Sequence, residues 1–301
     1  MDESLKLRYY FAVSTIVDGV AMSQIRVVDF QSPTAAADFT AGLKEMGFAV
    51  LSNHPVSQQL IDQAYTQWYE FFKSSEKNTF KFNPSTHDGY ISTELSETAK
   101  GYNVKDLKEF YHYYQGRRCP AECLATTSQL EKELNSMAST LLSWVEKNSP
   151  EEVRARFTMP LSDMIQNSDH TLLRLIHYPP LTGNEPKDAM RAAAHEDINL
   201  LTLLPAATAE GLQVKDAFGD WVDVPINPGW IIVNAGDMLQ ECTNHYYIST
   251  SHRVLNPTGE DAKKSRLSMP LFLHPHDEVV LSERHTRLSY YEERMREIGL
   301  K

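Results

Sequence analysis

The sequence predicts an α+β fold with a mainly β core, in which a helical N-terminal layer packs on a C-terminal antiparallel β-sandwich or barrel. In the first half of the chain, apolar residues recur three and four apart, which is typical of one face of an α-helix. After Asp169, short apolar runs alternate with proline, glycine and aspartate, a spacing that favours antiparallel strands over β-α-β units. No internal repeat or change of composition marks a linker, so we expect a single domain.

The N-terminal region is predicted to begin with a strand at residues 25–30, after a leader of residues 1–24 whose order we do not predict. A helix should follow from Ser32 and Pro33, an N-cap residue and a proline at the first helical position. Gly47 should end this helix, because glycine is the common residue just past a helix C-terminus. A buried strand is expected directly afterwards, up to Leu51.

Two further amphipathic helices are predicted in the first half. The second helix begins at Ser57, and the third runs from about Thr127 to Lys147. The expected inner face of the second helix consists of Ile61, Ala64, Tyr65, Trp68, Phe71 and Phe72. The expected inner face of the third consists of Leu130, Leu134, Met137, Leu141, Trp144 and Val145. We interpret these residues as core packing, since large apolar side chains at helical spacing usually face the interior.

The second half is predicted to be a series of short strands closed by a helix. The strands are expected at residues 172–178, 198–204, 212–214, 221–224, 230–234 and 267–273, and the helix at residues 288–298. Turn residues separate the runs, such as Pro179-Pro180 after the first of them.

Composition and charge restrict the class of protein. The 301 residues include 29 basic and 40 acidic side chains, for a formal charge of −11, whereas a nucleic-acid binder normally carries a basic stripe. No stretch approaches the roughly 18 apolar residues that a membrane span requires. Three cysteines do not form a disulfide framework, which favours a reducing compartment. We therefore expect a cytoplasmic protein that binds neither membrane nor nucleic acid.

The candidate metal ligands are two histidines and one aspartate in the β-rich half. His195 and Asp197 form a His-x-Asp pair, and His252 is separated from Asp197 by 54 residues. Two imidazoles and one carboxylate are the ligands of a non-haem Fe(II) facial triad, which leaves positions open for oxygen chemistry. The same side chains can bind zinc, so the identity of the ligands leaves the metal open.

Arg266 and Ser268 form a candidate anion site. On an extended strand the two side chains project to the same face, because side chains alternate with period two. A guanidinium binds both oxygens of a carboxylate, and a hydroxyl donates one more hydrogen bond. An anionic co-substrate could be anchored there while its other end reaches the metal.

A series of motifs in the second half identifies a family resemblance. The series comprises His195-x-Asp197, residues 201–204, 210–214 and 221–225, Pro228-Gly229, residues 234–237 and 251–254, and Arg266-x-Ser268. In order and spacing it resembles the isopenicillin N synthase-like branch of the Fe(II)/2-oxoglutarate-dependent dioxygenases. The first half resembles the family's N-terminal region through residues 27–30, residues 47–50 with Asn53-His54, and Asp106-x-Lys108-Glu109-Phe110.

The resemblance implies a double-stranded β-helix, or jelly roll, with an N-terminal helical layer and a C-terminal helix. It implies one oxygenase domain over residues 25–301, made of a mixed helical region (25–168), a jelly-roll core (169–276) and a C-terminal helix (277–301).

The resemblance also implies the cofactors and the residues that hold them. Iron would be held by His195, Asp197 and His252. The co-substrate 2-oxoglutarate would chelate the iron, with its far carboxylate at Arg266 and Ser268. Tyr178 matches a family tyrosine that can reach the co-substrate or the substrate. The second substrate would be O₂, with ascorbate as a possible reductant.

The expected activity is hydroxylation, desaturation or cyclisation of a small organic molecule, with release of succinate and CO₂. Two alternatives stay open from the sequence. One is an iron oxidase of the same fold that does not use 2-oxoglutarate, since isopenicillin N synthase and aminocyclopropane carboxylate oxidase keep an Arg-x-Ser. The other is a non-catalytic sensor of metal or 2-oxoglutarate. Beside Asp197, Asn199 either lines the pocket or caps a turn. The primary substrate and the oligomeric state are not predicted.

Overall fold

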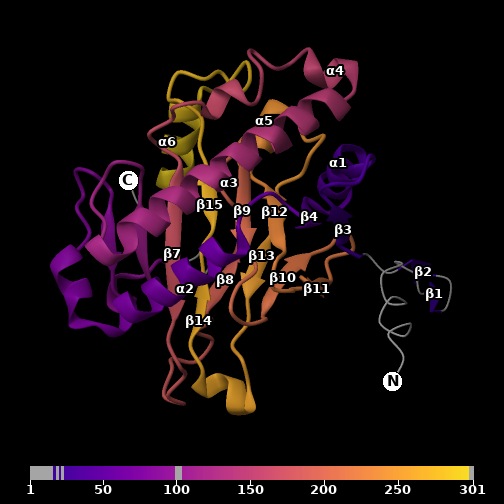
Figure 1. Cartoon of the computed structure of the whole chain (residues 1–301). Coiled ribbons are helices and arrows are strands. Elements are labelled where there is room, and N and C mark those ends of the chain that lie inside the picture. The colour runs from indigo at the N-terminus through magenta and orange to yellow at the C-terminus, as the bar shows by residue number, and fades with distance from the viewer. Residues whose placement is uncertain (1–15, 18–19, 22–23, 99–103, 298–301) are drawn as a thin grey trace.

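A computed structural model describes residues 16–17, 20–21, 24–98 and 104–297 (Figure 1). Within the expected leader, β1 (Ile16–Val17) and β2 (Val20–Ala21) pair as a two-stranded ribbon. The rest of the leader up to residue 23, and Ile298 at the end of the expected last helix, lie outside the described residues.

The core consists of two facing sheets, which confirms the predicted jelly roll. The major sheet has the order β3 (Arg26–Asp29), β4 (Phe48–Ser52), β12 (Ile231–Ala235), β9 (Leu201–Pro205), β15 (Leu271–Leu273), β7 (Leu172–Tyr178), β6 (Glu109–Tyr113) and β5 (Gly89–Ile91), and β14 (Arg266–Ser268) also pairs with β7. The minor sheet has the order β11 (Trp221–Asp223), β10 (Leu212–Lys215), β13 (His252–Val254) and β8 (Ala192–His195). Only β3 and β4 pair in parallel among the described ladders of these sheets.

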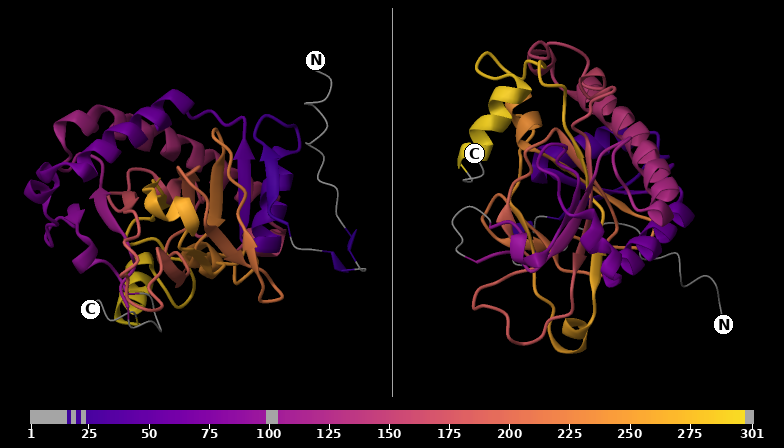
Figure 2. Two further views of the ribbon diagram at one scale, coloured as in Figure 1. Left: turned by 90° about the horizontal axis from the view of Figure 1, so that it is seen from below. Right: turned by 90° about the vertical axis from the view of Figure 1, so that its left-hand side faces the viewer.

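Helices cover the outer face of the major sheet, as the two views in Figure 2 show. This layer is built from α1 (Ala35–Met46), α2 (Gln58–Lys73) and α3 (Ala121–Asn148), with α3 in contact with both α1 and α2. The shorter α4 (Glu151–Arg154), α5 (Asp237–Cys242) and α6 (Arg287–Glu297) follow along the chain. Short 3₁₀ helices occur at η2 (Ser75–Phe80), η3 (Thr93–Leu95), η4 (Asp163–Ile165) and η5 (Gly259–Lys263). None of the described helices is both long and apolar enough to cross a bilayer.

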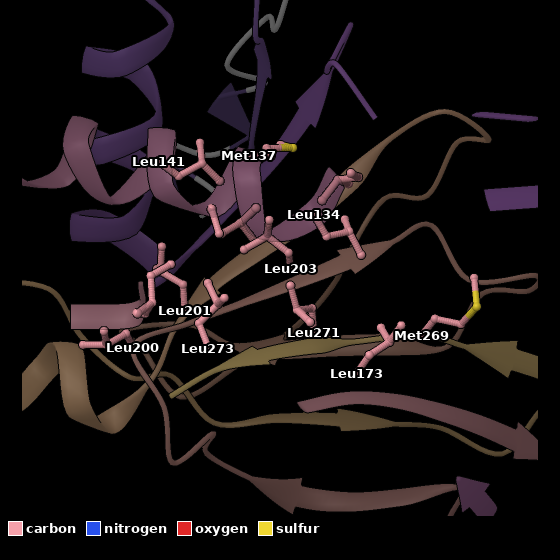
Figure 3. Packing of buried hydrophobic residues seen from close by; sticks show 14 of the residues in the cluster. Leu134, Met137, Leu141, Leu173, Leu200, Leu201, Leu203, Met269, Leu271 and Leu273 are labelled. Carbon is pink, nitrogen blue, oxygen red and sulfur yellow. The ribbon is translucent and has the colours of Figure 1, made fainter. Parts of the chain in front are cut away.

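The three layers enclose two hydrophobic cores. Between the helices and the major sheet, Leu134 and Leu141 of α3 belong to the same cluster as Leu203 and Leu271 of the sheet (Figure 3). Between the two sheets, a smaller cluster includes Phe48, Val50, Val214, Ile232 and Val254. Strand β12 is buried along its whole length because both of its faces are covered. Burial of this apolar surface is the main force that holds the layers together.

The predicted helix α2 is confirmed in its start and its inner face. The Ser57 hydroxyl accepts a hydrogen bond from the backbone N–H of Leu60, so Ser57 is the N-cap. The six residues expected on the inner face are the six that the helix buries. The end of α1 is also as predicted, since Gly47 adopts a left-handed conformation and its N–H bonds to the carbonyl of Leu43.

The predicted start of α1 at Ser32 is wrong by two residues. Ser32 and Pro33 belong to a turn in which the Ser32 hydroxyl accepts from the N–H of Thr34, and Thr34 takes the N-cap position. The serine thus closes a local turn of its own before the helix begins.

The third helix begins earlier than predicted, at Ala121 rather than near Thr127. Its first turns contain one large apolar residue, Leu124, which is exposed, so no apolar stripe marks them. Pro120 before Ala121 is the signal that could have located this start. Trp144, expected on the inner face, is half-buried and packs against Phe30 with ring centroids 4.8 Å apart.

Two predicted strands differ in extent. The strand expected at 198–204 begins only at Leu201, since residues 198–200 form the bend after Asp197. The strand expected at 267–273 is two strands, because Pro270 cannot donate to a ladder and interrupts it. Strands β5, β6, β8 and β13 and the short helix α5 were not predicted.

Glu131 of α3 generates a prediction about stability. It is only 3% exposed, and burial raises the pKa of its carboxyl from 4.5 to about 7. The raised pKa means that the carboxyl stabilises the fold below its ordinary pKa, and that this stabilisation is lost as pH rises through about 7. The difference in unfolding free energy between Glu131→Gln and wild type should therefore shift in favour of the variant by about 2 kcal/mol when the pH is raised from 5 to 8.

Urea unfolding at the two pH values measures this gain. Glu122→Gln is the control, because Glu122 lies exposed in the first turn of the same helix and should show no such change. A difference for Glu131→Gln that stays constant with pH would contradict the prediction.

Candidate metal centre and anion pocket

The three candidate metal ligands converge although 54 residues separate the last two. His195 ends β8 and His252 begins β13, and the antiparallel register of these strands places the two residues opposite each other. Asp197 follows two residues after β8, and its Oδ1 lies 3.9 Å from Nε2 of His195 and 3.7 Å from Nε2 of His252. One ligand atom from each residue lies within 4.8 Å of the others. No other such group of three occurs among the residues that the structure describes.

Backbone contacts orient both imidazoles. Nδ1 of His195 lies 2.8 Å from the carbonyl of Ala193, and Nδ1 of His252 lies 3.1 Å from the carbonyl of Thr250. A carbonyl accepts, so each Nδ1 carries the proton and each Nε2 presents a lone pair toward Asp197. Burial, and then the neighbouring His252, lower the pKa of His195 to about 4. His195 is therefore neutral at pH 7, as a metal ligand must be.

The Asp197 carboxylate is held through its other oxygen. Oδ2 accepts a hydrogen bond from the Thr202 hydroxyl and a second one from Nδ2 of Asn234, which lies 2.8 Å away. Burial acts to raise the pKa of Asp197, but the two imidazoles and these hydrogen bonds outweigh it, so the pKa lies below its ordinary value. Asp197 is thus ionised, with Oδ1 free toward the histidines.

Thr202 and Asn234 are functional residues whose role was not foreseen. Both belong to motifs of the family resemblance, Thr202 within residues 201–204 and Asn234 within 234–237, but neither motif by itself indicates a contact with Asp197. Asn199 is the next member of the network, since its Nδ2 donates to the Thr202 hydroxyl at 2.8 Å. Asn199 is buried and does not line the pocket, so of its two predicted roles the structural one applies.

Gly236 lets the bend after Asp197 pack against the end of β12. Its N–H donates to the carbonyl of Leu200, and the next N–H, of Asp237, donates to the carbonyl of Asp197. A Cβ at position 236 would lie 2.1 Å from Oδ1 of Asn199 and 2.8 Å from the carbonyl oxygen of Asp197. Only glycine fits this close approach of two backbones.

The donor chemistry of this site fits a ferrous ion. Two neutral imidazoles and one carboxylate present three donor atoms, and a metal held by three protein ligands keeps positions open for other ligands. Zinc accepts the same donors, so the side chains alone do not choose between the two metals.

Arg266, Ser268 and Tyr178 lie in the same pocket as the three ligands. Strand β14 pairs with β7 so that Arg266 lies opposite Tyr178. Leu267 faces the other way, into the core beneath the helices, which confirms that Arg266 and Ser268 share a face. Nε of Arg266 donates to the carbonyl of Ala209, whereas its buried Nη1 has no partner. An unpartnered buried guanidinium nitrogen fits a carboxylate as ligand.

His177 points away from this pocket. Its Nδ1 lies 2.7 Å from a carboxylate oxygen of Glu109 and its Nε2 lies 2.9 Å from the Ser265 hydroxyl. The side chain links three segments on the outer face of β7, in agreement with the structural role expected for it.

The pocket contains two cations that sequence reasoning did not select, Lys108 and Arg174. Lys108 is buried beside Asp106, with Nζ 2.8 Å from its carboxylate. Arg174 pairs with Glu97, and its Cζ lies 4.7 Å from the Phe110 ring centroid and 5.3 Å from that of Phe272. Arg174 shares the inward face of β7 with Tyr178, since the two residues are four positions apart on the strand. Period-two alternation could have identified Arg174, but nothing local could have identified Lys108.

Comparison with known families and proteins supplies independent findings. The family model described as the 2OG-Fe(II) oxygenase superfamily matches residues 169–275. A second family model, the N-terminal region of a non-haem dioxygenase in morphine synthesis, matches residues 20–131.

Solved structures match the whole fold. A crystal structure of a Shewanella oneidensis protein described as an oxygenase is 50% identical, with a TM-score of 0.85 over 93% of this chain and 100% of that chain. A 2OG-Fe(II) oxygenase family protein from Caulobacter crescentus is 31% identical, with a TM-score of 0.75 over 92% of this chain and 100% of that chain. Among curated proteins, jasmonate-induced oxygenase 3 of Arabidopsis thaliana is 29% identical over 80% of this chain and 67% of its own length.

The support of Asp197 by Thr202 generates a prediction. Thr202→Val removes a hydrogen bond to the carboxylate while keeping the shape of the side chain, and partners of this kind typically affect metal affinity roughly ten- to hundredfold. We therefore expect Fe(II) to bind roughly ten- to hundredfold more weakly, as measured by anaerobic titration calorimetry.

The matched control is Thr127→Val. Thr127 is also buried and accepts a hydrogen bond, from Trp68 at 2.9 Å, but it lies in α3 away from the metal ligands. Equal Fe(II) affinity in wild type and Thr202→Val would show that the hydroxyl does not support the ligand.

Proposed function

The chain belongs to the 2OG-Fe(II) oxygenase superfamily and is a non-haem Fe(II)/2-oxoglutarate-dependent dioxygenase, and from this premise we propose which residues carry the reaction. His195, Asp197 and His252 hold the iron. Arg266 and Ser268 bind the far carboxylate of 2-oxoglutarate, with Tyr178 beside them. One observation carries the proposal: three convergent donor atoms and a guanidinium whose Nη1 has no partner among the described residues line one pocket.

Each residue has a defined task in this proposal. With iron, 2-oxoglutarate and O₂ bound, the site supplies oxidation of a C–H bond coupled to conversion of 2-oxoglutarate into succinate and CO₂. The chain orients the two imidazoles through Ala193 and Thr250, and keeps Asp197 ionised through Thr202 and Asn234. Leu204, Leu212 and Val254 form apolar walls, which disfavour water beside the reacting atoms.

We propose that the substrate is a small organic acid. Of the described residues that line the pocket, Asp197 is the only carboxylate, whereas Lys108, Arg174 and Arg266 are cations. With Asp197 committed to the metal and Arg266 to the co-substrate, Lys108 and Arg174 face the remaining space. A cationic pocket with apolar walls favours an anionic ligand. The Phe272 ring, which lines the pocket beside Arg174, would pack against the apolar part of the substrate.

The proposed setting is the cytoplasm, and no role in nucleic-acid binding is proposed. The net charge of −11 opposes association with a phosphate backbone. Burial raises the pKa of the Cys119, Cys123 and Cys242 thiols to about 12, so these cysteines do not form reactive thiolates at neutral pH.

The proposed cofactor residues are tested by anaerobic titration of Fe(II) and 2-oxoglutarate, followed through the metal-to-ligand charge-transfer absorption band. We expect His195→Ala to lose the metal and therefore the band. Arg266→Ala should keep the metal but bind 2-oxoglutarate roughly ten- to hundredfold more weakly, because it loses a charge-assisted hydrogen bond.

Wild type should consume O₂ only when 2-oxoglutarate is present, with one succinate formed for each O₂ consumed. Bands that are unchanged in both variants would reject the residue assignments. Oxygen uptake without 2-oxoglutarate would favour the oxidase alternative instead.

The proposed substrate class is tested with small carboxylic acids and their matching carboxamides. Acids should stimulate 2-oxoglutarate-dependent oxygen uptake and the amides should not. We expect Arg174→Gln to raise KM for the best acid by at least about tenfold, since a charge-assisted contact is lost. Arg253→Gln is the control, because this guanidinium lies over Trp221 at 4.0 Å and does not line the pocket. Equal stimulation by acids and amides would contradict the anionic substrate.

A further inference from the structure

Arg191 is a buried guanidinium without an acidic partner. The residue directly precedes β8, and it is 2% exposed. Nη2 donates to the backbone carbonyl of Lys264 at 3.0 Å, and the buried Nε has no hydrogen-bond partner. Within residues 24–98 and 104–297, no carboxylate forms an ion pair with it. Buried charges in proteins are usually paired, so this arginine requires an explanation.

A second buried arginine faces the same tyrosine. Cζ of Arg191 lies 5.8 Å from the Tyr178 ring centroid, and Cζ of Arg266 lies 5.0 Å from it. Arg266 is 1% exposed and likewise has no ion pair among the described residues. Burial, and then repulsion by Arg266, lower the pKa of Arg191 to about 10, so Arg191 is still protonated at neutral pH. Two like charges thus flank one ring with no compensating carboxylate.

Arg287 is a buried arginine of the same chain that does have an acidic partner. It also lies over a tyrosine, with Cζ 4.8 Å from the Tyr291 ring centroid. Its Nη1 lies 2.6 Å from a carboxylate oxygen of Asp277. Arg287 is therefore neutralised by the protein itself. Arg191 and Arg266 have no such counter-ion in the described part of the chain, and together they create a positive potential at this end of the pocket.

We propose that Arg191 is a specificity-determining positioning residue, which makes the pocket select a 2-oxo acid with a second carboxylate. This inference rests on the proposed function, in which Arg266 and Ser268 bind that carboxylate. Arg191 is not among the residues that line the pocket, so it acts from beside Tyr178, through its charge and not through contact. The ligand carboxylate supplies the counter-ion that Arg191 and Arg266 do not have among the described residues.

The test compares 2-oxoglutarate with 2-oxopentanoate, which has a methyl group in place of the far carboxylate. Dissociation constants are measured by anaerobic titration calorimetry on the Fe(II)-loaded protein, so no turnover is needed. The readout is the ratio of the two constants. We expect Arg191→Met to reduce the preference for 2-oxoglutarate by about tenfold. Most of this change should come from weaker binding of 2-oxoglutarate, while the binding of 2-oxopentanoate stays nearly the same.

Two further variants separate charge from packing. Arg191→Lys keeps the positive charge and should keep most of the preference. Arg287→Met removes an arginine of similar burial and should leave the ratio within about twofold of wild type, since Arg287 is already neutralised by Asp277. Thermal unfolding of the ligand-free proteins checks the fold. We expect Arg287→Met to lower the unfolding midpoint, because it breaks a buried ion pair, and Arg191→Met to leave the midpoint unchanged.

The outcomes distinguish this inference from the proposed function. An unchanged ratio in Arg191→Met, or equal loss in Arg191→Met and Arg191→Lys, overturns the role of Arg191 alone. Failure of wild type to bind 2-oxoglutarate overturns the proposed function.

Discussion

The carboxylate of Asp197 is the interaction on which the rest of the site depends. Its Oδ2 is held by Thr202 and Asn234 of the major sheet, while Oδ1 faces His195 and His252 of the minor sheet. The group therefore joins the two sheets at the point where their strands approach. A buried carboxylate with one oxygen satisfied and the other free is costly without a cation, so the fold itself favours metal binding here.

Charge is distributed unevenly along the pocket. Asp197 is ionised where the imidazoles converge, whereas Arg266 lies on strand β14 with a guanidinium nitrogen that has no partner. Lys108 and Arg174 are neutralised in part by Asp106 and Glu97, which stabilise them in a buried position. The cations on the proposed substrate side are thus partly compensated, whereas Arg266 has no carboxylate partner among the described residues. In the proposed function, this difference lets one pocket hold two anionic ligands in different places.

The sequence predicted the features that repeat along the chain, and missed those that depend on distant contacts. A short apolar run ended by Pro179-Pro180 located β7, and period-two alternation gave the shared face of Arg266 and Ser268. Strand β8 was missed because Ala192–His195 contains no β-branched residue and no aromatic ring other than that of His195. The approach of Arg191 to Tyr178 depends on how the two sheets pack against each other, so no local pattern could have indicated it.

The register of β7 explains why a polar cluster lies on the outer face of the pocket wall. Arg174 and Tyr178 point inward from this strand, so His177 must point outward into apolar surroundings, stacked on Phe72 with centroids 5.4 Å apart. A buried imidazole needs partners for both nitrogens, and Glu109 of β6 and Ser265 before β14 provide them. A slip of one residue would exchange the two faces and leave His177 in the pocket. The outer hydrogen bonds therefore penalise that slip, and they fix Arg266 opposite Tyr178 from outside the site.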